Sequence, residues 1–384
     1  MKILHLTSIL PAPLSTKKYE NDILLRLAKE YEMKHPGTKH SFIYIVPFSN
    51  KLLSLLKNKW EEYRSILKMG TFHLDGYQVI VIGVPGFKND AILKSKLTLL
   101  GYYLNHKRIK EVLVEIKPDL IHAHNLGSNI ELAEIIRRSY SVPYVVTARN
   151  PEQIPLKRIR NSILRPKCII SHNRIFAEKC NQVGVPIHLV PHPVDGVFFF
   201  RDKQKNQDSR CLKLVTVCNL IRRKNIDKVI SVLKEIGGNF LYTVYGDGSE
   251  KAKLIDQVKL LNLQDKVSFK GYVPFNRIPQ VLSENDLFVM PSYNETLGRA
   301  YFEAMAMGIP VIASKNTGID KMIEHRVHGY LVDPVSKTEL KDAILHYLNL
   351  DNSKRMIMSD NAMMFAKQFT WEAILNEYYK IYNC

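Results

Sequence analysis

Short apolar runs rich in β-branched residues alternate along this chain with longer segments of helical periodicity. This alternation is typical of α/β proteins, in which helices cover both faces of a mainly parallel sheet. Because such strands are buried on both faces, each should read as a short continuous apolar run. The runs that we predict to be strands are residues 2–8, 41–46, 79–84, 120–123, 144–147, 168–171, 187–191, 213–217, 241–244, 267–270, 287–290, 310–313 and 330–332.

The rhythm of strands and helices stops at residues 191–196 and then restarts. This segment reads Pro-His-Pro-Val-Asp-Gly and is followed by the polar residues 201–210. Proline, glycine and charge between periodic segments mark a boundary loop. A length of 384 residues also fits about two domains, each large enough to bury its own core. We therefore predict two doubly wound domains of similar size and a final amphipathic helix around residues 371–381.

The formal net charge of +18 is unevenly spread along the chain. Residues 1–200 hold 29 of the 55 lysines and arginines but only 16 of the 37 acidic residues. A basic half indicates a polyanionic partner, either nucleic acid or an anionic membrane. The basic segments have little aromatic interleaving and no helix-turn-helix or zinc-finger spacing. We therefore predict that the partner of the basic half is an anionic membrane and that the protein binds no nucleic acid.

Three basic stretches, residues 51–68, 94–110 and 157–167, contribute most to this charge. The first two also carry apolar residues at helical spacing, and a basic helix with an apolar stripe suits an anionic membrane surface. The alternative is that each is an ordinary helix with its stripe on the core and its lysines in water. Five cysteines without C-x-x-C spacing indicate a reducing compartment. We expect a cytoplasmic protein, peripheral on the cytoplasmic face of the membrane.

Residues 287–313 form the segment with the clearest chemistry. The run 287–290 reads as a buried strand that Pro291 ends, so residues 294–298 form a loop at its carboxyl end, where open α/β sheets bind ligands. A helix that begins after Gly298 directs its free N–H groups there, which suits a phosphate. Glu295 and Glu303 can accept hydrogen bonds from sugar hydroxyls. The alternative is that Glu295 is a solvated loop carboxylate and Glu303 an ordinary acid in the first turns of the helix.

Glu295 and Glu303 are separated by seven residues and resemble the E-x7-E motif of the retaining glycosyltransferases of family 4. The resemblance extends to Pro291-Ser292, to Thr317-Gly318 and to residues 303–313 and 329–334. It implies the GT-B fold, in which two doubly wound Rossmann-like domains face each other across a cleft. Residues 1–192 would bind the acceptor, completed by a C-terminal helix at 368–384 that returns to this domain, and residues 193–367 would bind the nucleotide sugar.

The resemblance also implies roles for residues of the second half. Lys224 stands where the family carries a cation for the leaving diphosphate, and the alternative is a solvated surface lysine. Asn219 replaces the family's arginine, so Arg222, Arg223 or Arg299 is expected to supply the missing charge. Glu303 would hold the ribose hydroxyls and Glu295 a hydroxyl of the donor sugar. Further donor contacts are expected from Thr296, Leu297, Gly298, Arg299, Arg223 and Gly246, the last in a turn that resembles the family's Gly-Asp-Gly.

In the first half, residues 118–124 resemble the acceptor-domain segment that ends in His-x-His. The resemblance implies that His124 contacts the sugar or the acceptor, and the alternative is a hydrogen-bonded loop histidine. We expect His122 to point away from His124 and, because no third ligand has a suitable spacing, we expect no metal site. Acceptor-side candidates are Arg149, where many relatives carry histidine, and Ser15 and Thr16, in a loop without glycine.

The implied reaction moves a hexosyl residue from a UDP- or GDP-sugar to a hydroxyl of a lipid-linked or polysaccharide acceptor, with retention at the anomeric carbon. The leaving diphosphate would assist deprotonation of the acceptor, and neither a metal nor another cofactor is implied. Two other interpretations remain open. One is a catalytically inactive sugar-nucleotide-binding protein of the same fold, because Asn219 lacks the usual charge. The other is a basic nucleic-acid-binding protein.

Overall fold

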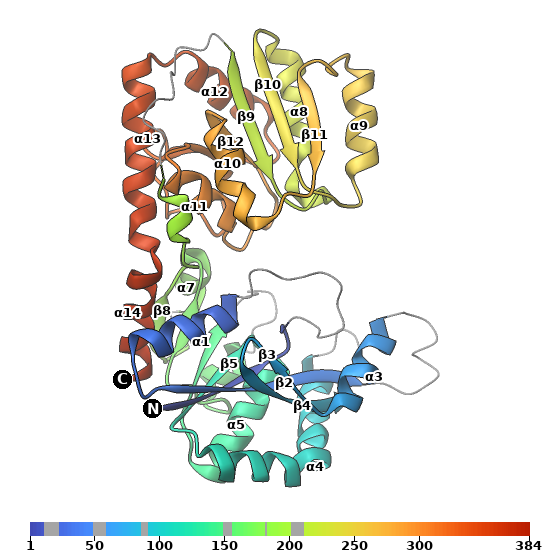
Figure 1. The fold of residues 1–384 in the computed structure, drawn as a ribbon, viewed down its shortest axis with the longest axis vertical. Helices are drawn as coiled ribbons and strands as arrows, with labels where there is room; N and C mark the ends of the chain where they lie inside the picture. Colours follow the sequence, from blue (N-terminus) through green and yellow to red (C-terminus); the bar gives the residue numbers. More distant parts are fainter. Residues whose placement is uncertain (11–22, 49–58, 86–90, 149–155, 181–182, 201–210) are drawn as a thin grey trace. The chain divides into compact units, whose positions relative to one another are not determined.

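The computed structural model of the chain describes residues 1–10, 23–48, 59–85, 91–148, 156–180, 183–200 and 211–384 (Figure 1). Ser15, Thr16 and Arg149 lie outside the described residues. The chain divides into two compact units. The first comprises Met1–Ser171, Phe176–Val190 and Leu375–Cys384, and the second comprises His172–Ile175 and Pro191–Ile374. Each unit is built on a mainly parallel sheet, so the predicted pair of Rossmann-like α/β domains is confirmed.

The first unit contains an eight-stranded sheet in the order β3-β4-β2-β1-β5-β6-β7-β8. Its strands pair in parallel except for β3 and β4, which form an antiparallel hairpin. The strands are β1 (Lys2–Thr7), β2 (Lys39–Phe48), β3 (Thr71–Leu74), β4 (Tyr77–Pro85), β5 (Leu120–His124), β6 (Tyr144–Ala148), β7 (Ile169–Ser171) and β8 (Ile187–Leu189). Every residue of β5 and β6 is buried, as expected for central strands covered on both faces.

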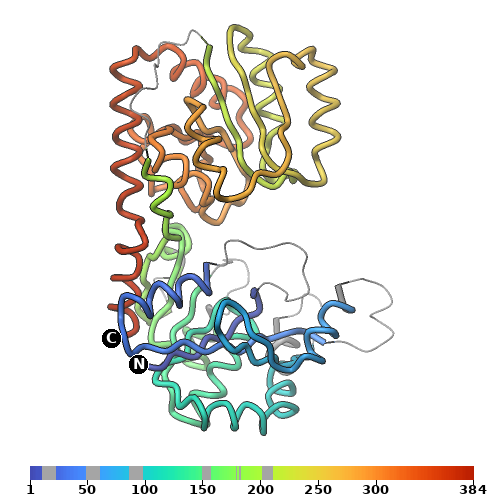
Figure 2. Tube along the Cα trace, in the orientation of Figure 1, coloured from blue at the N-terminus to red at the C-terminus, as the bar shows by residue number. Residues whose placement is uncertain are grey.

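Helices follow most of these strands along the chain, as the parallel topology requires. They are α1 (Ile23–Lys34), α3 (Lys59–Met69), α4 (Ala91–Ile116), α5 (Ser128–Tyr140), α6 (Leu156–Arg160) and α7 (Arg174–Cys180). The last residues of the chain also belong to the first unit, through the end of α14 (Trp371–Tyr382). Figure 2 shows this C-terminal end beside α1, where Lys34 Nζ donates to Asn376 Oδ1 at 2.7 Å and the Tyr31 and Tyr382 rings meet edge to face.

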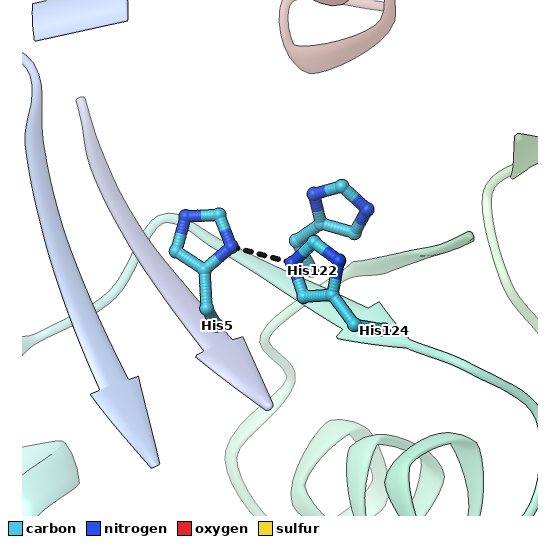
Figure 3. Close-up of side chains that lie close together, drawn as sticks. All are labelled: His5, His122 and His124. Atoms are coloured by element: carbon cyan, nitrogen blue, oxygen red, sulfur yellow. Dashed lines mark hydrogen bonds between the residues drawn. The ribbon is translucent and has the colours of Figure 1, made fainter. Parts of the chain in front are cut away.

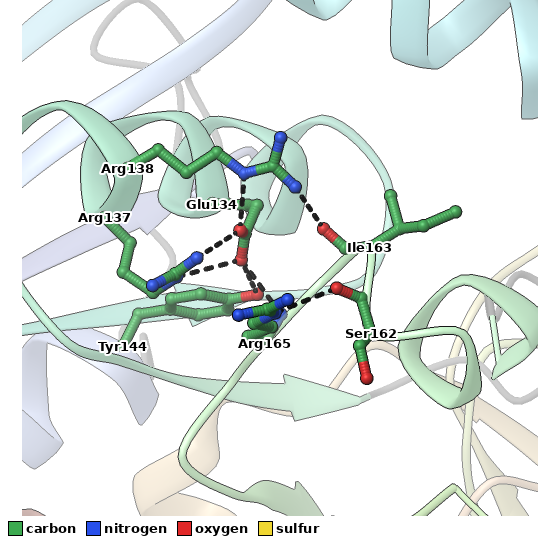
Figure 4. Close-up of polar contacts among 7 residues, drawn as sticks. All are labelled: Glu134, Arg137, Arg138, Tyr144, Ser162, Ile163 and Arg165. Carbon is green, nitrogen blue, oxygen red and sulfur yellow. Dashed lines mark hydrogen bonds and ion pairs between the residues drawn. The ribbon is translucent and has the colours of Figure 1, made fainter.

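A buried carboxylate ties several basic residues into the first unit (Figure 4). Glu134 of α5 accepts hydrogen bonds from Arg137 and Arg138, from the Tyr144 hydroxyl and from the backbone N–H of Arg165. Burial alone would raise the pKa of Glu134, but these donors outweigh it and lower the pKa to about 2. The carboxylate is therefore ionised at neutral pH and fastens α5 to β6 and to the segment before β7.

The second unit contains a six-stranded parallel sheet in the order β11-β10-β9-β12-β13-β14. Its strands are β9 (Leu212–Val217), β10 (Phe240–Tyr245), β11 (Val267–Gly271), β12 (Leu287–Val289), β13 (Val311–Ser314) and β14 (Gly329–Val332). Its helices are α8 (Ile226–Ile236), α9 (Lys251–Leu260), α10 (Ile278–Ser283), α11 (Arg299–Ala306), α12 (Lys337–Leu348) and α13 (Asn352–Ala366). The core forms on both faces of the sheet.

Each sheet contains one point at which the order of strands reverses. In the first unit it lies between β1 and β5, and in the second it lies between β9 and β12. Loops that leave the carboxyl ends of two such strands diverge to opposite faces and open a crevice, which is where doubly wound sheets bind ligands. The topology therefore predicts ligand-binding sites at the loops after β9 and β12 and at the carboxyl ends of β1 and β5.

Candidate functional site

The loops after β9 and β12 are tied together by hydrogen bonds. Asn225 adopts a left-handed conformation (φ 61°), and its side-chain amide donates to the carbonyls of Pro291 at 3.0 Å and Pro334 at 2.8 Å. The Tyr293 backbone N–H donates to the Arg223 carbonyl at 2.7 Å. These bonds place the short 3₁₀ turn Arg222–Lys224 directly beside the segment that carries Glu295.

Glu295 forms an ion pair with two cations of this turn. Its Oε2 atom lies 2.5 Å from Lys224 Nζ and 3.2 Å from Arg223 Nη1. The side chains of Lys224 and Glu295 are only 10% and 9% exposed, whereas that of Arg223 is 45% exposed. Lys224 is therefore not a solvated surface lysine. A largely buried ammonium at the crevice of the sheet is positioned to bind a phosphate oxygen.

A second acid and cation lie on α11, which starts at Arg299 directly after Gly298. Glu303 is buried, and its Oε1 atom accepts a hydrogen bond from Arg299 Nη2 at 3.3 Å, one helical turn earlier. Burial raises the pKa of Glu303, with Arg299 opposing the shift and Asp195 adding to it. Gly298, the residue before α11, has no side chain to cap the first turn, and the Tyr301 N–H donates to the Gly298 carbonyl at 3.0 Å.

Glycines allow the backbones around these side chains to approach closely. The Gly318 N–H donates to the Glu295 carbonyl at 2.8 Å, and a Cβ atom at Gly318 would overlap the Thr296 carbonyl. Gly298 has a φ of 75°, in the left-handed region that glycine tolerates best. Gly246 packs against the Cys218 carbonyl so closely that a side chain has no room. The geometry therefore gives Gly246 a packing role, whether or not it also contacts a donor.

The structure brings some of the predicted donor residues together in two clusters and leaves the others outside them. Arg223, Lys224 and Glu295 meet directly, and Arg299 and Glu303 form a second pair. Thr296 and Gly298 lie in the loop between them, half-buried. The Leu297 side chain is 2% exposed and belongs to the core, so only its backbone is available to a ligand. Arg222 is exposed.

Two features of this region were not predicted from the sequence. One is the Asn225 clamp, and the other is Lys228, whose ammonium donates to the Tyr293 hydroxyl at 3.1 Å and to the Pro334 carbonyl. The sequence signal for the Asn225 clamp was weak, because an asparagine that follows three basic residues can adopt many conformations. Asparagine does tolerate the left-handed region better than most residues, which is the property that Asn225 uses here.

In the first unit, His124 is buried at the carboxyl end of β5 and its Nε2 atom lies 2.7 Å from Nδ1 of His5 on β1 (Figure 3). The prediction that His122 points away was wrong. The rings of His122 and His124 lie 3.9 Å apart between centroids, because residues two apart on a strand share a face. The premise that no third ligand accompanies this pair was also wrong, since a ring nitrogen of His5 lies with them.

Two family models match the chain. The model described as Glycosyl transferases group 1 matches residues 198–364, and the model described as Glycosyltransferase Family 4 matches residues 72–196. The first match contains the whole second sheet and the second contains β4–β8 of the first sheet, and both sheets are the doubly wound kind found in GT-B glycosyltransferases. The chain belongs to family 4 of the glycosyltransferases.

Individual proteins are similar to this chain over part or all of its length. The amylovoran biosynthesis glycosyltransferase AmsK of Erwinia amylovora is 35% identical over 184 residues, which are 45% of this chain and 45% of AmsK. The putative teichuronic acid biosynthesis glycosyltransferase TuaC of Bacillus subtilis is 23% identical over 90% of this chain and 89% of its own. The structure of Anabaena HepE with UDP-glucose superposes with a TM-score of 0.67 at 20% identity, covering 100% of this chain and 99% of HepE.

None of the helices in the described part of the chain combines the length and apolar character that a membrane crossing requires.

Proposed function

We propose that this protein is a retaining glycosyltransferase that moves a hexosyl residue from a UDP- or GDP-sugar to a hydroxyl of a glycan or lipid-linked acceptor. The observation that carries the proposal is the ion pair of Lys224 with Glu295 at the crevice between β9 and β12. Parallel sheets bind nucleotides in this crevice, and the pair supplies both a cation for phosphate and an acceptor for hydroxyl groups.

In this proposal the diphosphate of the donor lies between Lys224, Arg223 and the uncapped N-terminus of α11. All three favour negative charge, and they would stabilise the diphosphate most strongly as it gains charge on leaving. Before the donor binds, Glu295 balances the two cations. Once it binds, Lys224 turns to the phosphate, and Glu295 accepts a hydrogen bond from a sugar hydroxyl. Glu303 accepts hydrogen bonds from the ribose hydroxyls.

The reaction would then proceed on one face of the sugar. The bond between the anomeric carbon and the diphosphate oxygen breaks, and a bond from that carbon to the acceptor oxygen forms on the same face. The acceptor proton passes to the leaving diphosphate oxygen. The proposal assigns no metal to this step, because the Lys224 and Arg223 cations and the helix N-terminus supply the positive charge there.

The similar proteins support the proposed substrate classes, a nucleotide sugar as donor and a polysaccharide precursor as acceptor. HepE was solved with UDP-glucose, and AmsK and TuaC are named for polysaccharide biosynthesis. We carry over the nucleotide sugar as donor and a polysaccharide precursor as acceptor. His124 is proposed to act on the acceptor side through its neighbours at the carboxyl end of β5.

A panel of UDP-, GDP- and ADP-sugars tests the proposal, with release of the nucleoside diphosphate as the readout. Turnover is expected with a UDP- or GDP-sugar, and a bound donor is expected to raise the melting temperature. Donor binding without turnover would favour the catalytically inactive alternative. If no sugar nucleotide binds or reacts, the assignment of the crevice is rejected.

We also propose that the first unit associates with the cytoplasmic face of a membrane through α4. Four apolar side chains on this helix are exposed to solvent by 43–64%, namely Leu99, Leu100, Tyr103 and Leu104. Lys107 and Lys110 follow one to two turns later and are also exposed. Their spacing puts the apolar residues on one stripe with cations at its end, the arrangement that binds an anionic bilayer surface.

The protein is expected to sediment with anionic liposomes, to stay in solution with neutral ones, and to dissociate from the anionic ones in high salt. Replacing both Lys107 and Lys110 with serine should weaken this binding by roughly tenfold or more, because each cation contributes about 1 kcal/mol near such a surface. Val335→Ser, at an exposed apolar position of the second unit, serves as the control. Equal binding to neutral liposomes, or salt-sensitive RNA binding that exceeds liposome binding, would contradict the membrane proposal.

A further inference from the structure

Three histidines gather on one face of the first sheet at the point where its strand order reverses. His5 of β1 pairs in register with His122 of β5, and His124 follows two residues later on the same face. One ring nitrogen from each of the three lies within 4.8 Å of the other two. Each of the three side chains is at most 1% exposed, and Figure 3 shows the rings converging from the two strands.

We propose that His5, His122 and His124 form a binding site for a divalent transition-metal ion, with Zn²⁺ as the best fit. Imidazole nitrogen suits zinc, and three histidines with a fourth position open to a small ligand are an established zinc environment. The three ligands lie in the first unit and the donor crevice lies in the second, and the ion is given no step in the transfer proposed above. Its role would be to link β1 and β5 at the centre of the sheet.

The spacing of the nitrogens is close to what zinc requires. Zn–N bonds of about 2.0–2.1 Å in a tetrahedral site hold the nitrogens roughly 3.4 Å apart. His5 Nδ1 and His124 Nε2 lie 2.7 Å apart, because they share a hydrogen bond. Binding the ion would require these two nitrogens to move apart by somewhat less than 1 Å.

The surrounding residues are placed to hold the ligand histidines in the required tautomer. His5 Nε2 lies 2.6 Å from His40 Nδ1, so it can donate a hydrogen bond there while Nδ1 binds the ion. His122 has the Tyr382 hydroxyl at 2.8 Å from Nδ1 and the Thr147 hydroxyl at 2.7 Å from Nε2. Whichever nitrogen of His122 binds, the opposite one keeps an oxygen partner. Such partners orient most metal-binding histidines in proteins.

His5 Nδ1 and His124 Nε2 share one hydrogen bond, so one of these two rings must change tautomer before both nitrogens can bind the ion.

The test is a titration of the untagged protein with Zn²⁺ after treatment with a chelator and desalting. One equivalent is expected to bind in competition with a chromophoric chelator and to raise the melting temperature. Co²⁺ is expected to bind at the same stoichiometry and to give the visible absorption of a four-coordinate ion. Less than about one tenth of an equivalent of bound Zn²⁺ would overturn the proposal.

Variants connect the bound ion to these residues. The His122→Gln and His124→Gln proteins should no longer bind the one equivalent of Zn²⁺. His40→Gln should weaken Zn²⁺ binding by about 10–100-fold. His106→Gln, at an exposed position on α4, should leave Zn²⁺ binding unchanged. Unchanged binding in folded His122→Gln and His124→Gln proteins would overturn the assignment. If these variants do not fold, the X-ray absorption spectrum of the wild-type zinc complex decides, since it must show three imidazole ligands.

Discussion

Replacing Lys224 with alanine is expected to reduce kcat by about 10²–10³-fold while the protein stays folded. The loss is that of one preorganised cation at the charge that develops on the leaving diphosphate. The fold should survive because Glu295 keeps a second partner in Arg223, at 3.2 Å. Glu303→Ala should also abolish most turnover at donor concentrations below the raised KM, since it removes contacts that the donor makes before reaction.

Arg223→Ala is the matched control for this experiment. Arg223 contacts the same carboxylate as Lys224, but its side chain is 45% exposed against 10% for Lys224. An exposed charge is screened by water, so its removal should cost much less than removal of the buried one. Thermal unfolding and circular dichroism of each variant establish that the fold is kept. Wild-type rates in both Lys224→Ala and Glu303→Ala would remove the site assignment.

Gly318→Ala is expected to lower turnover by about 10²-fold through a displacement of the loop that carries Glu295. A Cβ atom at Gly318 would overlap the Thr296 carbonyl, and the Gly318 N–H holds the Glu295 carbonyl at 2.8 Å. Backbone atoms cannot rotate away as a side chain can, so the loop itself must move. A shift of about 1 Å in a positioning element is enough for a loss of this size.

The same substitution should destabilise the second unit by about 1–3 kcal/mol, as overpacking usually does. Gly196→Ala is the control, because no atom lies within 4 Å of the Cβ position there and its φ is not left-handed. Initial rates and melting temperatures of the two variants are the measurements. A Gly318→Ala protein with normal turnover and a lower melting temperature would show that the position of this loop does not matter for catalysis.

Much of the fold could be predicted because the strands are short, apolar and buried on both faces. The strand expected at 213–217 was found at Leu212–Val217, and the final helix expected around 371–381 was found at Trp371–Tyr382. The hairpin strand Thr71–Leu74 was missed, since only Phe72 among its four residues is buried. Its one signal was Asp75-Gly76, both at positive φ, which joins two strands by a tight turn.

The sites were harder to predict because they depend on strand order. Lys224 and Glu295 are 71 residues apart and meet only because β9 lies beside β12, which no local pattern reveals. His5 and His124 are 119 residues apart and meet for the same reason across β1 and β5. The error over His122 had a different origin, since the two-residue periodicity of a strand was enough to place it beside His124.

The assignment of Leu375–Cys384 to the first unit has a consequence for how the protein is made. Residues Met1–Val190 leave the ribosome long before Leu375–Cys384 are synthesised. This last segment supplies the Tyr382 hydroxyl that contacts His122 and the Asn376 side chain that contacts Lys34. At about 5–20 residues per second, the delay is roughly 10–40 s. During that time most of the second unit is synthesised, while the first waits for Leu375–Cys384 to pack against α1 and the centre of its sheet.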